Sequence, residues 1–369
     1  MLILAAASLA LWLAVFVAPW RAWRCSERLE AEDADGPQPT GFTVLIPARN
    51  EAAVLGETLA AVRACAPGAR VVVVDDQSDD ATSAIAGSSG LENLTLVRGT
   101  PPAPGWTGKL WALEQGLQHA ATARVLLLDA DIRLAPGMLV ALQRKADQGY
   151  ALVSVCAEPC WTGAAARWLL PAFVYFFKLL YPFRLANRPG SRIAAAAGGV
   201  VLVDRQALIA AGGFRAWRDA IIDDCTLAAH VKRSGYRCWI GLTRGAVSLR
   251  RANLRDIAHM VARTAFVQLR ESITLLVAAT TLLVLAFWVP VLAACAGDGA
   301  VRWLGAAAWL TLIACYVPTL VYYRRNPLAS VALPAAATFF LVTTWYSAWR
   351  AFAGTRSVWK GRHYQRGAE

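Results

Sequence analysis

The sequence predicts an α/β domain that carries apolar, membrane-spanning helices on both sides in the chain. Between residues 41 and 270, short β-branched runs alternate with segments of helical spacing, which is typical of a parallel sheet covered by helices on both faces. One apolar run, 125–128, ends in two closely spaced carboxylates. Long apolar segments at 2–20 and beyond 272 predict the membrane helices.

The composition excludes an ordinary water-soluble enzyme. Of the 369 residues, 57% are hydrophobic, and many of the 15 Trp lie near the ends of apolar runs, as interfacial anchors do. The formal net charge of +12 is compatible with nucleic-acid binding, but the chain has no nucleic-acid-binding motif. Attraction to anionic lipid and to a phosphorylated substrate explains the charge better. The 8 Cys form no CxxC pair, and we expect reduced thiols.

Residues 1–24 are predicted to form an N-terminal transmembrane helix. The apolar stretch 2–20 is followed at once by Arg21 and Arg24. By the positive-inside rule, the N-terminus of the helix is therefore expected outside and its C-terminus in the cytoplasm. The alternative is a cleaved signal peptide, but the stretch has no basic n-region and no small-residue cleavage site. The polar residues 25–40 then form a linker.

The α/β domain is predicted to cover residues 41–270. Asp129 and Asp131 follow its run 125–128, which reads as an interior strand, and ligands of such sheets bind beyond the carboxyl ends of the strands. Two carboxylates there suit Mg²⁺ or Mn²⁺ carrying a diphosphate; the alternative is a solvated acidic turn. The other predicted strands are 42–46, 71–74, 94–97, 151–156 and one within 194–203, and the predicted helices are 52–64, 109–118, 138–146 and one that opens at 221–227.

Residues 168–185 are unusually rich in Leu, Phe and Tyr for a soluble domain. Pro171 and Lys178 interrupt the apolar pattern, which makes a full membrane span a poor interpretation. A helix in the membrane interface beside the active site is preferred over a buried helix.

Residues 271–353 are predicted to form C-terminal transmembrane helices. Segments 273–294, 303–323 and 328–352 are each long enough to span a bilayer, and the arginines at 324–325 predict a cytoplasmic loop. Three spans would place the basic tail, 354–369, outside, against the positive-inside rule. One segment is therefore expected to be re-entrant or interfacial, and Pro334 points to the last one.

As an ordered set, the motifs resemble those of membrane-bound family-2 glycosyltransferases, which have the GT-A nucleotide-sugar (Rossmann-like) fold. Within that family the chain is most similar to hopanoid-biosynthesis-associated glycosyltransferases, relatives of the ceramide glucosyltransferases; the single N-terminal helix and the tail Trp359-Lys-Gly-Arg362 carry this narrower likeness. The motifs are Val44-Leu-Ile-Pro-Ala-Arg-Asn-Glu51, Val74-Asp-Asp-Gln-Ser-Asp79, Gly108-Lys109, Asp129-Ala-Asp131, Gly198-Gly199, Gly212-Gly-Phe214 and Ile222-Asp-Asp-Cys-Thr-Leu227.

The resemblance implies a role for each motif residue. Asp224 is the expected general base, because an inverting displacement needs a carboxylate to take the proton of the acceptor hydroxyl. Simple helix capping is the alternative for Asp223, an ordinary solvated lysine for Lys109, and a tight turn for the Gly198 pair. The implied donor-binding residues are Pro47, Arg49, Asn50, Glu51, Asp75, Asp76, Lys109, Asp129, Gly198 and Gly199; the metal ligands are Asp131 and Asp129; and the acceptor or diphosphate residues are Asp223, Arg263, Gln268 and Arg270.

The sequence therefore predicts an inverting glycosyltransferase of the inner (cytoplasmic) membrane, with its catalytic domain in the cytoplasm. The expected partners are a UDP-linked sugar, a divalent metal and a membrane lipid acceptor, with a hopanoid link implied by the resemblance alone, and no nucleic acid. One alternative is a polyprenyl-phosphate sugar synthase. Another is a non-catalytic membrane scaffold with a degenerate nucleotide-binding domain, against which the acids Asp76, Asp131 and Asp224 argue.

Overall fold

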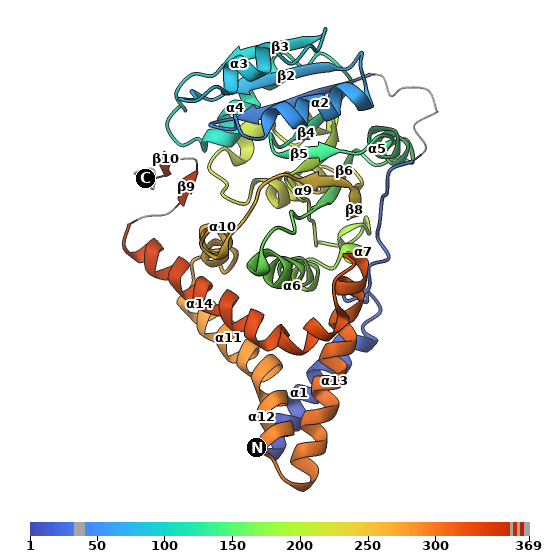
Figure 1. Ribbon diagram of the computed structural model, residues 1–369, viewed down its shortest axis with the longest axis vertical. Helices are drawn as coiled ribbons and strands as arrows, with labels where there is room; N and C mark the ends of the chain where they lie inside the picture. The colour runs from blue at the N-terminus through green and yellow to red at the C-terminus, as the bar shows by residue number, and fades with distance from the viewer. Residues whose placement is uncertain (33–40, 355–356, 360–361, 365–369) are drawn as a thin grey trace. The chain divides into compact units, whose positions relative to one another are not determined.

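The chain divides into two compact units in the computed structural model, which describes residues 1–32, 41–354, 357–359 and 362–364 (Figure 1). An α/β unit comprises residues 27–160, 185–251 and the C-terminal end from 357, and a helical unit comprises 1–26, 161–184 and 252–356. Part of the predicted linker, 33–40, and most of the predicted basic tail lie outside the described residues. The domain boundaries predicted from the sequence, 41 and 270, stay predictions.

The α/β unit is built on an eight-stranded sheet in the order β3-β2-β1-β4-β7-β6-β8-β5. β1, β2, β3 and β4 are parallel, as expected, but β7 is antiparallel to both of its neighbours and β5 is antiparallel to β8. The predicted α/β class is confirmed, and the prediction of a purely parallel sheet is wrong. The strands are β1 (Phe42–Ala48), β2 (Arg70–Asp75), β3 (Leu94–Arg98), β4 (Arg124–Leu128), β5 (Ile132–Leu134), β6 (Leu152–Glu158), β7 (Val200–Asp204) and β8 (Cys238–Ser248).

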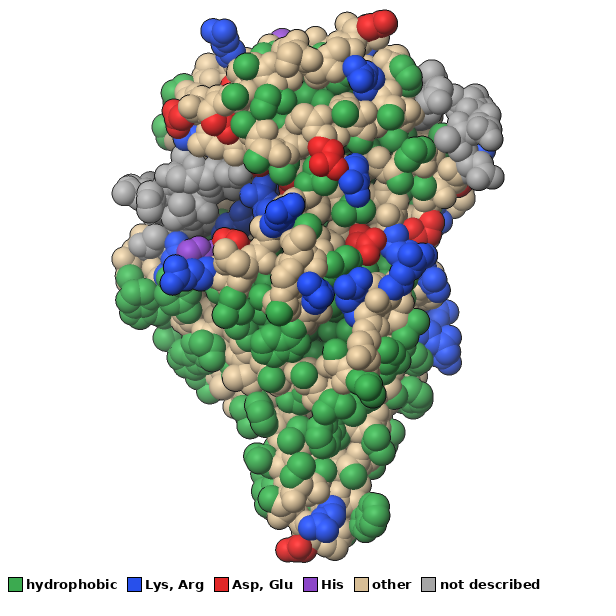
Figure 2. All heavy atoms as spheres, in the orientation of Figure 1, with side chains coloured by type: hydrophobic (Ala, Val, Ile, Leu, Met, Phe, Trp, Pro, Cys, Tyr) green, Lys and Arg blue, Asp and Glu red, His purple; other side chains and the backbone are tan. Residues whose placement is uncertain are grey.

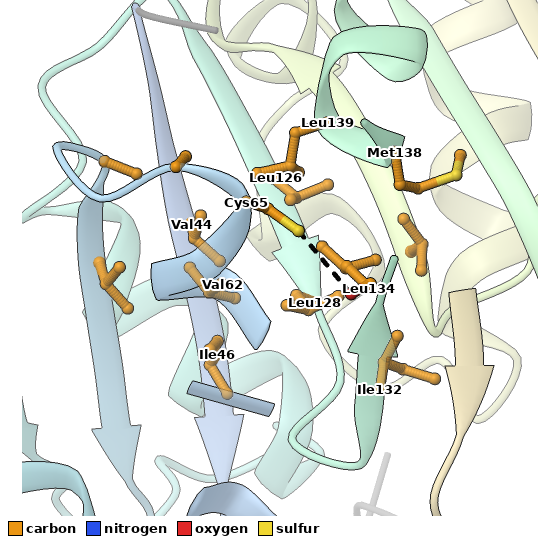
Figure 3. Close-up of a cluster of buried hydrophobic side chains, with 14 of the residues drawn as sticks. Val44, Ile46, Val62, Cys65, Leu126, Leu128, Ile132, Leu134, Met138 and Leu139 are labelled. Carbon is orange, nitrogen blue, oxygen red and sulfur yellow. Dashed lines mark hydrogen bonds between the residues drawn. The ribbon is translucent and has the colours of Figure 1, made fainter. Parts of the chain in front are cut away.

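Helices cover both faces of this sheet. Side chains alternate along a strand, so Val44 and Ile46 of β1 enter the core on one face and Leu45 enters the core on the other. Figure 3 shows the first core, where Val62 and Cys65 of α2 meet the strands. This face is covered by α2 (Leu55–Cys65), α3 (Thr82–Gly87) and α5 (Met138–Asp147), and the opposite face by α4 (Gly108–Leu117), α8 (Arg205–Ala210), η1 (Phe214–Trp217) and α9 (Asp223–Arg233).

Residues 27–29 of the predicted linker are bonded to the sheet. Arg28 forms a parallel bridge with Leu242 of β8, and the N–H of Leu29 donates to the carbonyl of Leu242 at 2.9 Å. Residues 357–359 and 362–364 form a short antiparallel pair, β9 (Ser357–Trp359) and β10 (Arg362–Tyr364), that the sequence did not predict.

Among its described residues, the helical unit contains three helical stretches that are long and apolar enough to cross a membrane, namely 273–296, 299–322 and 327–352. Many hydrophobic side chains are exposed on its surface (Figure 2). Leu275, Leu292 and Trp303 are among the exposed ones. Its elements are α1 (Leu2–Val17), α6 (Ala164–Leu180), the first two residues of α7 (Phe183–Ala186), α10 (Leu254–Gln268), α11 (Ile273–Leu283), the π-helical η2 (Val284–Trp288), α12 (Val289–Ala296), α13 (Gly299–Tyr322), η3 (Pro327–Ala332) and α14 (Leu333–Phe352).

Two prolines in this unit have identifiable effects. Pro290 has no N–H, so the carbonyl of Ala286 four residues earlier lacks its helical partner; the indole N–H of Trp12 donates to that carbonyl at 2.7 Å and ties α1 to this segment. Pro334 lies in the first turn of α14, where proline is well tolerated, and the helix continues to Phe352. Pro334 therefore does not break the last apolar segment. It gives no reason to expect that this segment, rather than another, is re-entrant.

Residues 168–180 of the predicted interfacial helix lie in α6, which contains Pro171, but α6 ends at Leu180 and residues 183–185 belong to α7. One face of α6, with Leu169 and Tyr175, packs in the core of the helical unit. Lys178, 1% exposed, donates to the Sγ of Cys25 at 3.2 Å. The burial of this face agrees with the buried-helix alternative, and the interfacial position stays a prediction.

Candidate active site

The two carboxylates after β4 are held by backbone contacts. The N–H of Asp129 donates to the carbonyl of Gly199 at 3.0 Å, and its own carbonyl accepts from the N–H of Ile132 at 3.1 Å, which closes a tight turn into β5. The carbonyl of Asp131 accepts from the N–H of Leu249 at 2.7 Å, just beyond β8. The sheet edge therefore presents both side chains from a rigid frame.

Lys109, at the start of α4, bridges two acids from different elements. Its Nζ lies 2.9 Å from Oδ1 of Asp129 and 3.3 Å from Oδ2 of Asp223. Burial alone lowers the pKa of Lys109, but the two carboxylates outweigh it and hold the pKa above its ordinary value. Burial raises the pKa of Asp129, with Lys109 opposing the shift. Lys109 is therefore a permanent cation between acids, rather than a solvated lysine.

Asp224 is oriented by two backbone donors. The N–H of Gly198 donates to its Oδ2 at 2.8 Å, and the N–H of Cys225 donates to its Oδ1 at 2.7 Å. Burial raises the pKa of Asp224 to about 6, and the charge of Asp223 adds to the rise while Lys109 opposes it. A carboxylate whose pKa lies near neutral pH in a fixed orientation is suited to accept a proton.

Gly198 is needed for the close approach of these groups. A Cβ at this position would lie 3.2 Å from Nζ of Lys109 and 3.4 Å from Oδ2 of Asp224. A Cβ at Gly199 would lie 3.2 Å from Cδ1 of Ile132. The glycine pair therefore brings the backbone against the charged groups and the start of β5.

Asp131 is neutralised by a residue that the sequence analysis did not single out. Nε of Arg250 lies 3.3 Å from Oδ2 of Asp131, and Nη2 of Arg250 lies 2.9 Å from Oε1 of Glu51. The hydroxyl of Ser248 also donates to Oδ2 of Asp131, at 2.9 Å. The signal in the sequence was the Arg250-Arg251 pair, which begins two residues after the end of β8.

The loop after β2 is joined to the loop after β1 by hydrogen bonds. The guanidinium of Arg49 donates to the carbonyl of Asp76 at 2.6 Å, and the side-chain oxygen of Asn50, which has a φ of +52°, accepts from the N–H of Asp79 at 2.9 Å. Asp75 accepts from the N–H of Ser78 at 3.0 Å and from the hydroxyl of Ser83. Arg49, Asn50 and Asp75 thus order this part of the predicted donor site.

A pocket lies between the ends of β1, β4 and β7 and the helices α4 and α9. Its charged wall contains Lys109, Asp129, Asp223 and Asp224, and Pro47 and Gly198 also line it. The rest of its wall is apolar and comes from α4, β4, β7, η1 and α9: Leu110, Leu113, Leu127, Leu128, Val201, Phe214, Trp217 and Leu227.

The structure does not bring every predicted residue to this pocket. Arg263, Gln268 and Arg270 belong to the helical unit, whose position relative to the α/β unit is not assigned. There, the amide oxygen of Gln268 accepts from the hydroxyl of Tyr181 at 2.8 Å. Their roles toward acceptor or diphosphate stay predictions.

The acids at the sheet edge suit a divalent cation that is carried by its substrate. Among the described residues, no group of three or more His, Cys, Asp or Glu side chains is arranged to enclose a metal. Mg²⁺, however, is commonly held by one or two carboxylates together with substrate phosphates. Asp129 and Asp131, two positions apart in the turn between β4 and β5, fit that pattern.

The comparisons with known proteins agree with this geometry. The family model described as "Glycosyltransferase like family 2" matches residues 37–241, more than half of the chain. A 4,4'-diaponeurosporenoate glycosyltransferase of Staphylococcus aureus is 37% identical over 91 residues, 25% of this chain and 24% of that protein, so the match spans about a quarter of the curated relative.

One solved structure resembles nearly the whole chain. It is a mannosyltransferase from Pyrobaculum calidifontis in complex with GDP-Man and Mn²⁺, with a TM-score of 0.56 and 22% sequence identity. The likeness covers 93% of this chain and 99% of that chain, and it supports the fold. The α/β unit has the GT-A fold, and the chain is an enzyme that belongs to glycosyltransferase family 2.

Proposed function

We propose that this glycosyltransferase moves a sugar, with inversion, from a UDP-linked donor to a hydroxyl of a membrane lipid. The observation that carries the proposal is the fixed carboxylate of Asp224, which accepts the N–H groups of Gly198 and Cys225 in the same pocket as Lys109 and Asp129. Proton acceptor and cation thus lie on one wall, as a displacement at a sugar carbon requires.

Each charged residue of the site has its own role in the proposed displacement. Asp224 takes the proton of the acceptor hydroxyl while the hydroxyl oxygen attacks the anomeric carbon and the bond to the diphosphate breaks. Lys109 balances the negative charge that grows on the leaving diphosphate, and its raised pKa keeps it charged. Asp129 and Asp131 would hold Mg²⁺ or Mn²⁺, which supplies further positive charge to the diphosphate when bound.

The nucleoside half of the donor is assigned to the neighbouring strand ends. Pro47 lines the pocket, and Arg49, Asn50, Glu51, Asp75 and Asp76 lie in the loops after β1 and β2, whose carboxyl ends lie at the same sheet edge. A buried carboxylate such as Asp76 is suited to accept a hydrogen bond from an N–H of uracil or a hydroxyl of ribose.

A lipid acceptor is supported by the apolar composition of the helical unit and by the partial relative named for 4,4'-diaponeurosporenoate. We propose an acceptor of the hopanoid class, with the enzyme in the inner membrane and the α/β unit in the cytoplasm. The arginines at 324–325, which follow α13, support a cytoplasmic end for that helix.

A polyprenyl-phosphate sugar synthase is the second candidate. Its acceptor is already an anion and needs no base, so Asp224→Asn would slow it only mildly. The near-neutral pKa of Asp224 favours the hydroxyl acceptor, because a hydroxyl needs a base to accept its proton and a phosphate acceptor does not.

The test is donor turnover by the full-length protein in lipid nanodiscs. A panel of nucleotide sugars is supplied with Mg²⁺ or Mn²⁺ and a total bacterial lipid extract, beside Asp131→Asn and Asp224→Asn. We expect one donor to be consumed only with metal, at least about 100-fold more slowly in Asp224→Asn. Consumption of no donor by a folded protein would contradict the proposed donor and acceptor, and equal turnover by Asp224→Asn would favour the phosphate acceptor.

A further inference from the structure

Arg250 connects two acids from distant parts of the chain. Its guanidinium contacts Asp131, beyond β4, and Glu51, beyond β1, at 3.3 and 2.9 Å. The side chains of Asp131 and Glu51 are 12% and 11% exposed, whereas that of Arg250 is 49% exposed. Arg250 thus pairs with two nearly buried carboxylates and reaches them from the surface.

The charges of this group favour one cation at a time. Buried carboxylates without a cation are strongly unfavourable, so Arg250 reduces their joint charge from −2 to −1. A divalent cation at Asp131 would bring positive charge directly beside the guanidinium. Repulsion between the two cations then opposes metal binding until a further anion arrives, and the diphosphate of a nucleotide sugar is such an anion.

The geometry also allows Arg250 to leave Asp131. The hydroxyl of Ser248 donates to the same carboxylate oxygen at 2.9 Å and stays bound through its position at the end of β8. The half-exposed guanidinium is planar and matches phosphate oxygens in a bidentate manner. Turning from Asp131 to a diphosphate oxygen exchanges one charged partner for another.

We propose that Arg250 is a donor-binding residue that couples metal binding to donor binding. Without donor, Arg250 pairs with Asp131 and Glu51. When the nucleotide diphosphate binds together with its divalent cation, Arg250 gives up Asp131 to the cation and pairs with the diphosphate. This inference rests on the proposed function, in which Asp131 is a metal ligand.

The experiment measures Mn²⁺ binding rather than catalysis. The full-length protein in nanodiscs is titrated with MnCl₂, and free Mn²⁺ is followed by electron paramagnetic resonance, with and without UDP. Arg250→Met removes the cation, and Arg251→Met is the matched control, because Arg251 is the next residue and is exposed.

We expect UDP to tighten Mn²⁺ binding by the parent at least about fivefold, the lower end of ordinary coupling between two ligands. Arg250→Met should bind Mn²⁺ alone at least about fivefold more tightly than the parent, bind UDP more weakly, and lose most of the coupling. Arg251→Met should match the parent. A misfolded variant would lose Mn²⁺ affinity, so a gain is specific to the removed competition.

Unchanged or weaker Mn²⁺ binding by Arg250→Met would overturn the proposal, as would full coupling in that variant. Failure of the proposed function is seen separately. If neither UDP nor GDP binds the parent, the nucleotide-donor assignment fails and the coupling fails with it, while the Mn²⁺ arm alone still reports whether Arg250 competes at Asp131.

Discussion

The Oδ2 atom of Asp224 accepts the backbone N–H of Gly198 at 2.8 Å, which links the start of α9 to the loop that precedes β7. The other oxygen, Oδ1, is bound to the N–H of the next residue, Cys225. The carboxylate is therefore held from both sides before any substrate arrives, and its orientation does not depend on the acceptor.

The pH dependence of turnover follows from the raised pKa of Asp224. The base works only when deprotonated, and its pKa is about 6, so kcat/KM should fall about tenfold for each pH unit below 6 and level off above 7. A pH–rate profile from pH 5 to 8 tests this, with Asp219→Asn, an acid that does not line the pocket, as the control. A flat profile over this range would contradict the assignment.

Removing the positive charge of Lys109 should move that profile. Lys109 lowers the pKa of Asp224 and pairs with Asp129 and Asp223, so Lys109→Met should shift the acidic limb to higher pH and weaken donor binding. Lys109→Arg keeps the charge and should leave the limb near its original pH. The test compares the acidic limbs of the pH–rate profiles of the two variants with that of the parent. If the limb of Lys109→Met coincides with the parent's, the charge of Lys109 does not set the pKa of Asp224.

A methyl group at Gly198 should reduce turnover with little effect on stability. Its Cβ would lie 3.2 Å from Nζ of Lys109, so the lysine must shift by a few tenths of an ångström from its position beside Asp129. Gly190→Ala, in the same loop with nothing within 4 Å of its Cβ, is the matched control. We expect Gly198→Ala to lower kcat at least about tenfold, about 1.4 kcal/mol, while both variants unfold near the parent's midpoint.

Asp75 is expected to act through the loop that it orders. Its carboxylate accepts from the N–H of Ser78 and the hydroxyl of Ser83, and Asp75→Ala leaves these donors unpaired, at about 1–3 kcal/mol for a buried group. The variant should melt earlier and bind donor more weakly. Asp79→Ala, an exposed acid in the same loop, should melt like the parent in a thermal-shift assay. Equal melting temperatures for Asp75→Ala and Asp79→Ala would contradict the role of Asp75 in ordering the loop.

Local patterns predicted β1 to β4, β6 and β7 but not the strand directions, and they missed β5 and β8. The run of β7 is buried on both faces, so its sequence has the continuous apolar character of a parallel strand, although the strand is antiparallel to β4 and β6. Strand direction depends on the path of the chain between elements, which periodicity does not encode. Pro334 was misread for a related reason: its effect depends on whether it starts a helix or interrupts one.

The residues of the site were predictable where a strand end placed them. Asp129 was predicted because it follows the apolar run of β4, whereas the role of Asp224, which lies at the start of α9, was implied only by the resemblance of its motif to family 2. Arg250 could not, because its importance comes from contacts with Glu51 and Asp131, which lie 199 and 119 residues away in the sequence. Such a pairing follows from tertiary structure alone.

The most direct test of the central claim is to follow a radiolabelled sugar from its nucleotide donor into the lipid phase of nanodiscs. For the parent with Mn²⁺ we predict label in a single lipid product with inverted anomeric configuration, and at least about 100-fold slower transfer for Asp224→Asn. Label that is released only as free sugar, or transferred at the parent's rate by Asp224→Asn, would contradict the assignment of Asp224 as the base for a lipid hydroxyl.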